Sequence, residues 1–319
     1  MRDNIMLRRF TGLILTTTAL SLAASATAQT TLAELDAENE AVKSVIEVSS
    51  PIDYSDHDIL MERVTVSKGG RPRVAYDFLR NQDVDFVGNQ VSFLASQDIS
   101  ALNDNDRLAY WLNLQNIVTV QAVLEDGKKK KSLKKLRGTA DKPGKLWTKD
   151  RVTIGGQAMS LQDIETKLLT EFDNPNVIYG IYQGVRGGPC LMRKAYRGVT
   201  VNETLEQNAK QYVNSNGIVT VKNNVVELTP VFLWYQDAAF KGDDKVLLAH
   251  LKDNADPNLK SALYRGRSFA STSLNYSLDF HDVNKAAQER AAANRPAARP
   301  RPRTTPQPQP QPSGGGYGS

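Results

Sequence analysis

The chain has 319 residues, a formal net charge of +5, one cysteine and three histidines. A single cysteine excludes an intrachain disulfide, so we expect the apolar core alone to hold the fold. Three scattered histidines and one cysteine show none of the ligand spacings of a zinc site, and the acidic pairs lack the loop pattern of a calcium hand. The sequence therefore predicts no metal site and no cofactor.

The first 28 residues have the pattern of a secretory signal peptide. Two arginines precede an apolar segment at 13–24, and Ala26-Thr27-Ala28 forms a small-residue cleavage site. We expect cleavage after Ala28 and a periplasmic or secreted protein. The apolar segment is shorter than the roughly 20 residues of a spanning helix, so a retained membrane anchor is the less favoured alternative.

The remaining chain divides by composition. Residues 29–49 predict an N-terminal helical extension, and residues 50–284 predict one domain because no linker rich in proline, glycine or serine interrupts them. Residues 285–319 are mainly alanine, proline, arginine, glutamine and glycine. Such a segment buries too little apolar surface to fold, so we expect a disordered basic tail.

Within the domain, hydrophobic periodicity predicts more helix than strand. A hairpin is favoured where Asn223 and Asn224 separate two branched apolar runs, because asparagine tolerates a positive φ. The fold class predicted is α+β: a mainly helical single domain with a small sheet and a β-hairpin. Helices are expected at 56–63, 84–96, 105–125, 161–169, 203–213, 231–239, 243–252 and 257–264. Strands are expected at 151–154, 177–182, 218–221, 225–228 and 273–280, with a short strand or helix start at 73–76.

The strongest helix signal lies at 105–125, which is apolar on nearly every face. Such a helix is normally buried in the centre of a domain. Asn103 is the expected N-cap, and Asp106 three residues on is the expected capping-box acid. Asn113, Gln115 and Asn116 are then partly or fully buried amides, and each is expected to have a hydrogen-bond partner because an unsatisfied one costs roughly 1–3 kcal/mol.

Three sequence blocks occur in a fixed order: RLAYWLNLQN at 107–116, RVTIGGQAMSLQDIETKLL at 151–169 and NPNVIYGIYQGVRGGP at 174–189. Together with VFLWYQDAAF at 231–240, they resemble the domain of unknown function (DUF) 547 family over roughly residues 50–270. The resemblance implies a single α+β domain and no established reaction. Many members carry a histidine in place of Ile178 and cysteines in place of Gln183 and Gly188. Any chemistry of a Cys/His pair would lack both partners in this chain.

Cys190 follows a Gly-Gly-Pro turn between two arginines, a setting that can activate a thiol. A cysteine nucleophile also needs a base, and no histidine stands in a recognisable motif. We therefore favour a small buried residue after a turn over a nucleophile. Gly184-x-x-Gly187-Gly188 resembles a phosphate loop only weakly, since Pro189 ends it. A tight turn is the favoured interpretation.

Asp163 and Glu165 are two residues apart on a predicted helix, so their side chains diverge and do not suit paired acid and base chemistry. Asp163 is expected to form a capping box with Ser160. Glu165 is expected to form a structural ion pair with Arg186 or Arg193.

Basic residues are concentrated in 127–149 and in the tail. We identify Lys128, Lys129, Lys130 and Lys131 as a candidate anion-binding loop, with a solvated loop as the alternative. The partners that fit this charge are anionic lipid, lipopolysaccharide or a cell-wall polymer. Nucleic acid is disfavoured by export and by the lack of interleaved aromatic residues.

Two functional hypotheses follow. The first is an exported envelope protein with a non-catalytic binding or scaffold domain that contacts anionic envelope components; it assigns no catalytic residue. The alternative is a degenerate or atypical hydrolase or transferase with a polar cleft. The residues that would line that cleft, and serve as a candidate ligand-binding cluster, are Arg107, Asn113, Asn116, Glu165 and Arg186.

Overall fold

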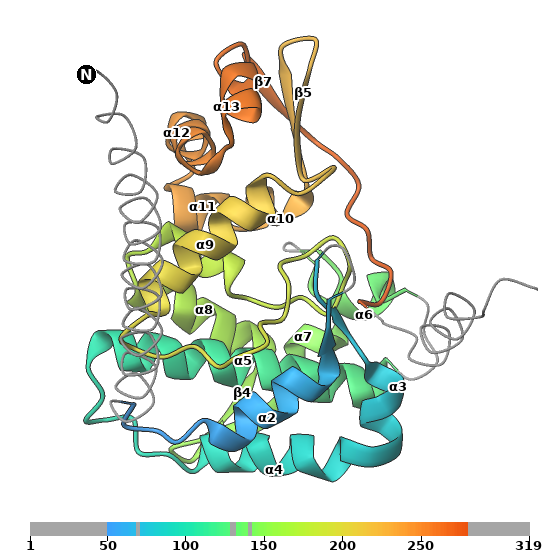
Figure 1. Cartoon of the computed structure of the whole chain (residues 1–319), viewed down its shortest axis with the longest axis vertical. Helices are drawn as coiled ribbons and strands as arrows, with labels where there is room; N and C mark the ends of the chain where they lie inside the picture. Colours follow the sequence, from blue (N-terminus) through green and yellow to red (C-terminus); the bar gives the residue numbers. More distant parts are fainter. Residues whose placement is uncertain (1–49, 68–70, 128–131, 140–141, 280–319) are drawn as a thin grey trace, which may run out of the picture. The chain divides into compact units, whose positions relative to one another are not determined.

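Helix α5, Asp104–Asp126, is the element around which the other helices pack (Figure 1). A computed structural model describes residues 50–67, 71–127, 132–139 and 142–279. All of these residues fall within one compact unit. The predicted signal peptide, N-terminal extension and basic tail lie outside the described residues. Among the described helices, none combines the length and the apolar character needed to cross a membrane.

The burial of α5 confirms the predicted central helix. Almost every residue from Leu108 to Leu124 is buried, which matches the apolar character of all its faces. The side chain of Asn103 accepts a hydrogen bond from the backbone N–H of Asp106 at 2.9 Å, so the predicted N-cap is also confirmed. The Asp106 carboxylate accepts from the side-chain amide of Asn103 at 2.6 Å, in place of the expected capping-box bond to the Asn103 backbone.

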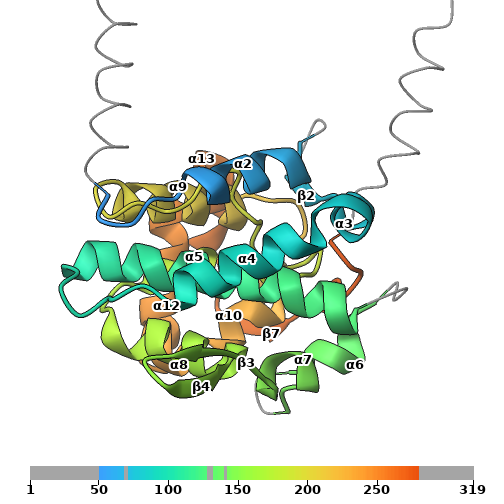
Figure 2. The ribbon, with the colours of Figure 1, turned by 90° about the horizontal axis from the view of Figure 1, so that it is seen from below.

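Helices α4, α8 and α9 pack against α5, α2 packs against α4, and Figure 2 shows α4 lying alongside α5. Before α4, the short helix α3 is followed directly by a π-helical turn. The N-terminus of α8 carries the predicted capping box between Ser160 and Asp163. The bounds are Ser55–Val64 for α2, Tyr76–Phe78 for α3, Leu79–Asp83 for the π-helical turn, Val84–Ala95 for α4, Leu161–Glu171 for α8 and Val201–Val213 for α9.

The C-terminal part adds four helices, of which α12 is the longest. The single helix predicted at 231–239 is wrong, because Tyr235, at φ −110° and ψ 9°, separates two helices. The buried Tyr235 hydroxyl accepts a hydrogen bond from Gln183, a partner that sequence periodicity does not reveal. The bounds are Pro230–Trp234 for α10, Gln236–Phe240 for α11, Asp244–Asn254 for α12 and Pro257–Leu263 for α13.

Three small sheets complete the described part and confirm the mainly helical α+β class. The predicted hairpin is present, with Asn223 and Asn224 at φ 50° and 62°. The third sheet has the order β5-β6-β7, and β7 runs parallel to β6. The antiparallel pairs are β1 (Thr65–Val66) with β2 (Arg73–Val74), β3 (Asp150–Ile154) with β4 (Gln157–Ser160), and β5 (Val219–Lys222) with β6 (Val225–Leu228).

The strand predicted at 177–182 is wrong. Pro175–Tyr179 forms a 3-10 helix, η2, and the following residues are irregular. Pro175 suits the first helical position, and the side chain of Asn174 accepts a hydrogen bond from the N–H of Asn176 at 2.9 Å. The apolar run therefore indicates burial in the core, whereas the local capping residues determine its backbone conformation.

The last predicted strand is displaced. Strand β7 covers Ser268–Ser271, whereas 273–280 was expected. Residues 272–279 instead form a strap that pairs at isolated bridges, Ser277 with Ser132 and Leu278 with Val185. Phe280 lies outside the described residues.

Candidate functional site: the α6–α7 segment and its polar centre

The basic stretch after α5 contains two short helices, α6 (Lys134–Arg137) and α7 (Lys145–Thr148). Leu133, Leu146 and Trp147 are buried, so the described part of this segment packs on the core. A Cβ on Gly144 would lie 2.2 Å from the Leu136 carbonyl oxygen, which shows how closely the two helices approach. The candidate loop at 128–131 lies outside the described residues.

Arg137 points inward from α6 and is only 2% exposed. Its guanidinium carbon lies 3.9 Å from the ring centre of Trp147 and 4.5 Å from that of Trp234. Its Nε donates a hydrogen bond to Gln183 Oε1 at 2.7 Å. The cation therefore contacts two indole rings and is oriented along one edge by an amide.

Glu165 of α8 faces the same place. Trp147 Nε1 donates to Glu165 Oε2 at 2.6 Å, and Gln183 Nε2 donates to the Tyr235 hydroxyl at 2.7 Å. Burial raises the pKa of Glu165, while the charge of Arg137 and hydrogen bonds from Trp147 and Tyr235 oppose that rise. Gln183 thus links the cation to the acid through Tyr235. We call this set the polar centre: Arg137, Trp147, Glu165, Gln183, Trp234 and Tyr235.

The outer face of the α6–α7 segment carries lysines, and the cations of this stretch differ in whether a carboxylate lies beside them. Lys145 and Lys149 lie 3.8 and 4.0 Å from Asp126 and Glu125. The Arg151 side chain is 2% exposed and pairs with the same two carboxylates. Three exposed lysines have no ion pair among the described residues: Lys134, Lys135 and Lys142.

The residues expected to line a cleft have separate partners. Asn113 and Asn116 are buried in α5, and both have the hydrogen-bond partners predicted for them. The side chain of Asn116 accepts from the N–H of Tyr182 at 3.0 Å. Arg107, near the start of α5, binds Asp104 and the carbonyl of Leu102.

The other two expected cleft residues also differ in environment. Arg186 is exposed in the turn that precedes Cys190. The cation that acts on Glu165 is Arg137, in place of the expected Arg186 or Arg193, because α6 brings Arg137 beneath the lysine-rich face. Glu165 is thus the one member of the predicted set that belongs to the polar centre.

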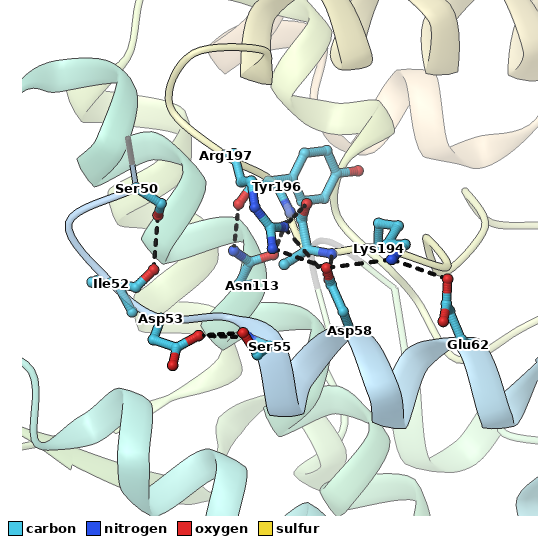
Figure 3. A network of polar contacts seen from close by, with 11 residues as sticks. Ser50, Ile52, Asp53, Ser55, Asp58, Glu62, Asn113, Lys194, Tyr196 and Arg197 are labelled. Carbon is cyan, nitrogen blue, oxygen red and sulfur yellow. Dashed lines mark hydrogen bonds and ion pairs between the residues drawn. The ribbon is translucent and has the colours of Figure 1, made fainter. Parts of the chain in front are cut away.

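Asn113 also connects to a second buried network (Figure 3). Asp58 of α2 lies 2.9 Å from Arg197 and accepts a hydrogen bond from the N–H of Ala195 at 2.6 Å. Lys194 spans Asp58 and Glu62 at the rim. These contacts fasten α2 to the segment at 194–197, so we assign the network a structural role.

Cys190 lies in a narrow pocket whose volume leaves room for about one water molecule. Arg71 Nε donates to the Cys190 sulfur at 3.2 Å, yet burial raises the pKa of the thiol more than Arg71 lowers it. The nearby His250 is instead within hydrogen-bonding distance of the Tyr179 hydroxyl, at 2.9 Å. This arrangement favours the predicted structural role. The pocket is lined by Arg71, Tyr179, Pro189, Cys190, Asn208, Gln211 and Tyr212.

No cluster of three or more histidine, cysteine, aspartate or glutamate side chains suited to a metal ion occurs in the part of the chain that the structure describes. Sequence reasoning missed five members of the polar centre. A usable signal was present, since Leu133, Leu136, Leu146 and Trp147 interrupt the lysines at spacings that a purely solvated loop does not require.

Comparison with known families gives one match. The family described as a protein of unknown function, DUF547, matches residues 99–213. The match contains α5 and four residues of the polar centre, and it ends before Trp234 and Tyr235. Neither the curated proteins nor the solved structures include a match to this chain.

Proposed function

We propose that this protein is an exported, non-catalytic binding domain that contacts phosphate-bearing amphiphiles of the cell envelope. The contact is made through the exposed side chains of Lys134, Lys135 and Lys142 in the α6–α7 segment, which we call the lysine face. The observation that carries the proposal is that the lysines of this short segment fall into two groups, those near a carboxylate and those without an ion pair. Lys134, Lys135 and Lys142 are exposed without an ion pair among the described residues, whereas Lys145 and Lys149 are close to Asp126 and Glu125. Exposed unpaired charge is the feature that attracts an anionic surface.

The lysine face has a firm attachment to the core. Leu133 is fully buried, and its N–H donates to the carbonyl of Tyr276 at 2.9 Å. Ser132 forms a bridge with Ser277 of the strap. The four consecutive lysines at 128–131 immediately precede this attachment in the sequence. A fixed base lets several lysines act on one surface with little loss of backbone entropy on binding.

Export is part of the proposal and is supported by the arginine-led apolar segment and the A-x-A site before residue 29. Cell fractionation combined with N-terminal sequencing tests it. We expect a periplasmic or secreted chain that begins at Gln29. A chain found in the cytoplasm with its first 28 residues intact contradicts the export proposal.

The enzymatic alternative is less well supported by the arrangement of its residues. Asn113 and Asn116 use their amide oxygens within the closed core, on the backbone N–H groups of Tyr196 and Tyr182. Arg107 is engaged with Asp104 at the start of α5. These side chains are therefore committed to holding the fold.

Binding is tested by retention of the full-length chain on vesicles of anionic phospholipid, of zwitterionic phospholipid, and of lipopolysaccharide. We expect retention on the anionic vesicles that weakens as salt is raised, because the exposed charges are screened. Replacing Lys134, Lys135 and Lys142 by glutamine is expected to reduce retention. The matched control replaces Lys145 and Lys149 by glutamine, which removes charge that local carboxylates already offset.

The vesicle arms separate the two sources of phosphate, lipid headgroup and lipopolysaccharide. Equal retention on zwitterionic vesicles, or retention that does not change with salt, contradicts the proposal. An equal loss in the control variant also contradicts it, since net charge alone would then explain the binding.

A further inference from the structure

The polar centre contains an unusual cation. Arg137 is 2% exposed, and no carboxylate of the described residues forms an ion pair with it. Glu165 influences it through charge, but the Glu165 oxygens are engaged by Trp147 and face Tyr235. A buried arginine normally has a contacting anion, because removal from water is costly for an unpaired charge.

Much of the guanidinium is occupied. The rings of Trp147 and Trp234 both lie against it, and Gln183 binds its Nε. The remaining edge carries Nη1 and Nη2, which have no hydrogen-bond partner among the described residues. The two nitrogens are not completely buried, so this edge keeps a small contact with solvent.

We propose that the Nη1–Nη2 edge of Arg137 is a recognition site for the carboxylate of a small organic ligand. A guanidinium edge with two parallel N–H groups matches a carboxylate in a bidentate pair. The two indole rings and Gln183 fix the guanidinium before a ligand arrives, so little side-chain entropy is lost on binding. This site is separate from the lysine face, whose attraction to an anionic surface requires no defined geometry.

The surroundings favour a singly charged carboxylate over a phosphate. Burial raises the pKa of Glu165, and Arg137 lies close enough to oppose that rise, so the site already contains one acid. A second, doubly charged anion would meet repulsion from Glu165 that a monoanion meets only in part. Trp234 and Tyr276 are half-buried and pack 6.4 Å apart, centre to centre, which offers an apolar surface beside the cation.

The test follows the arginine side-chain N–H resonances of the full-length chain labelled with ¹⁵N-arginine. The Arg137 resonance is assigned by its loss in Arg137→Lys. The probes are sodium acetate, N-acetyl-alanyl-alanine and inorganic phosphate, each against sodium chloride at matched ionic strength. The amide of the same dipeptide is the neutral control, and the acetate and dipeptide arms separate a free acid from a peptide C-terminus.

We expect a saturable shift of the Arg137 resonance with acetate or with the dipeptide acid, and none with the dipeptide amide or chloride. Gln183→Glu places a carboxylate against Arg137 and should weaken binding by about tenfold or more through internal competition. The lysine-face variant should bind as the unaltered chain does, which separates this result from the proposed function. The proposal is overturned if no carboxylate shifts the Arg137 resonance, or if phosphate shifts it equally well.

Discussion

The side chain of Asn113 forms two hydrogen bonds with the backbone of Tyr196: Nδ2 donates to the carbonyl at 2.9 Å, and Oδ1 accepts from the N–H at 2.8 Å. The side-chain amide of Asn113 thus provides the hydrogen bonds that a neighbouring strand would otherwise give to this irregular segment, which passes over the central helix. Both groups are buried, so neither can turn to water when the partner is lost.

We predict that Asn113→Ala destabilises the protein by about 2–4 kcal/mol, because two buried backbone groups lose their partner and a small cavity remains. Denaturant unfolding of both proteins measures the difference. The control is Asn105→Ala on the same helix, where the side chain is exposed and the expected change is below about 1 kcal/mol. A similar loss in both variants contradicts the assigned role of Asn113.

The pair of Asp58 and Arg197 gives a second prediction. Asp58→Ala leaves the buried Arg197 guanidinium without its carboxylate and should cost about 3–5 kcal/mol of unfolding free energy. Glu62→Gln is the matched control, because its partner Lys194 is exposed and the expected cost is about 1 kcal/mol or less. Chemical denaturation decides between them. Equal costs would show that the buried pair carries no special weight.

The buried His57 and the partly buried His250 predict how stability depends on pH. Burial lowers the pKa of His57 to about 4 and that of His250 to about 4, from an ordinary value of 6.5. The folded state therefore binds fewer protons than the unfolded state between these values, so stability falls as pH falls through that window.

For His57 alone, lowering the pH from about 7 to about 5 should remove ~2 kcal/mol of unfolding free energy. His57→Phe should reduce this slope, since the unfolded chain then has one proton fewer to bind. Unfolding curves at a series of pH values provide the measurement. An unchanged slope in the variant would show that His57 is not the group responsible.

Two glycines give opposite predictions for the same substitution. A Cβ at Gly198 would lie 2.1 Å from Asp106 Oδ1, so Gly198→Ala must displace the start of α5 and should cost about 1–3 kcal/mol. A Cβ at Gly88 in α4 would meet nothing within 4 Å, so Gly88→Ala should stabilise the helix by about 0.5–1 kcal/mol. Thermal melts of the two variants should shift in opposite directions. A shift of the same sign in both contradicts the close approach at Gly198.

Local signals predicted the elements that local chemistry determines. The cap at Asn103, the capping box at Ser160 and the asparagine turn at 223–224 are each formed by residues within a few positions of one another. The apolar run at 177–182 was misassigned because burial alone does not distinguish a strand from an irregular core segment.

Local sequence signals do not predict the members of the polar centre, apart from Glu165. Its members come from α6, α7, α8, α10 and the residues around Gln183 and Tyr235, which meet only in three dimensions. Charge patterning placed Arg137 with the exposed lysines, because a one-dimensional pattern cannot show which cation turns inward. The proximity of Trp234 to Arg137 depends on the whole intervening chain.

The strap at 272–279 also affects the order in which the chain can fold. Its backbone accepts from Leu133 and Val74, and the N–H of Asp279 donates to the carbonyl of Gly184. Just before it, β7 pairs parallel to β6, from which α10 to α13 separate it along the chain. Contacts that join such distant positions form late and slowly. A nascent chain therefore lacks its closing contacts until residue 279 has been synthesised, and every C-terminal truncation that removes the strap should leave the earlier helices incompletely packed.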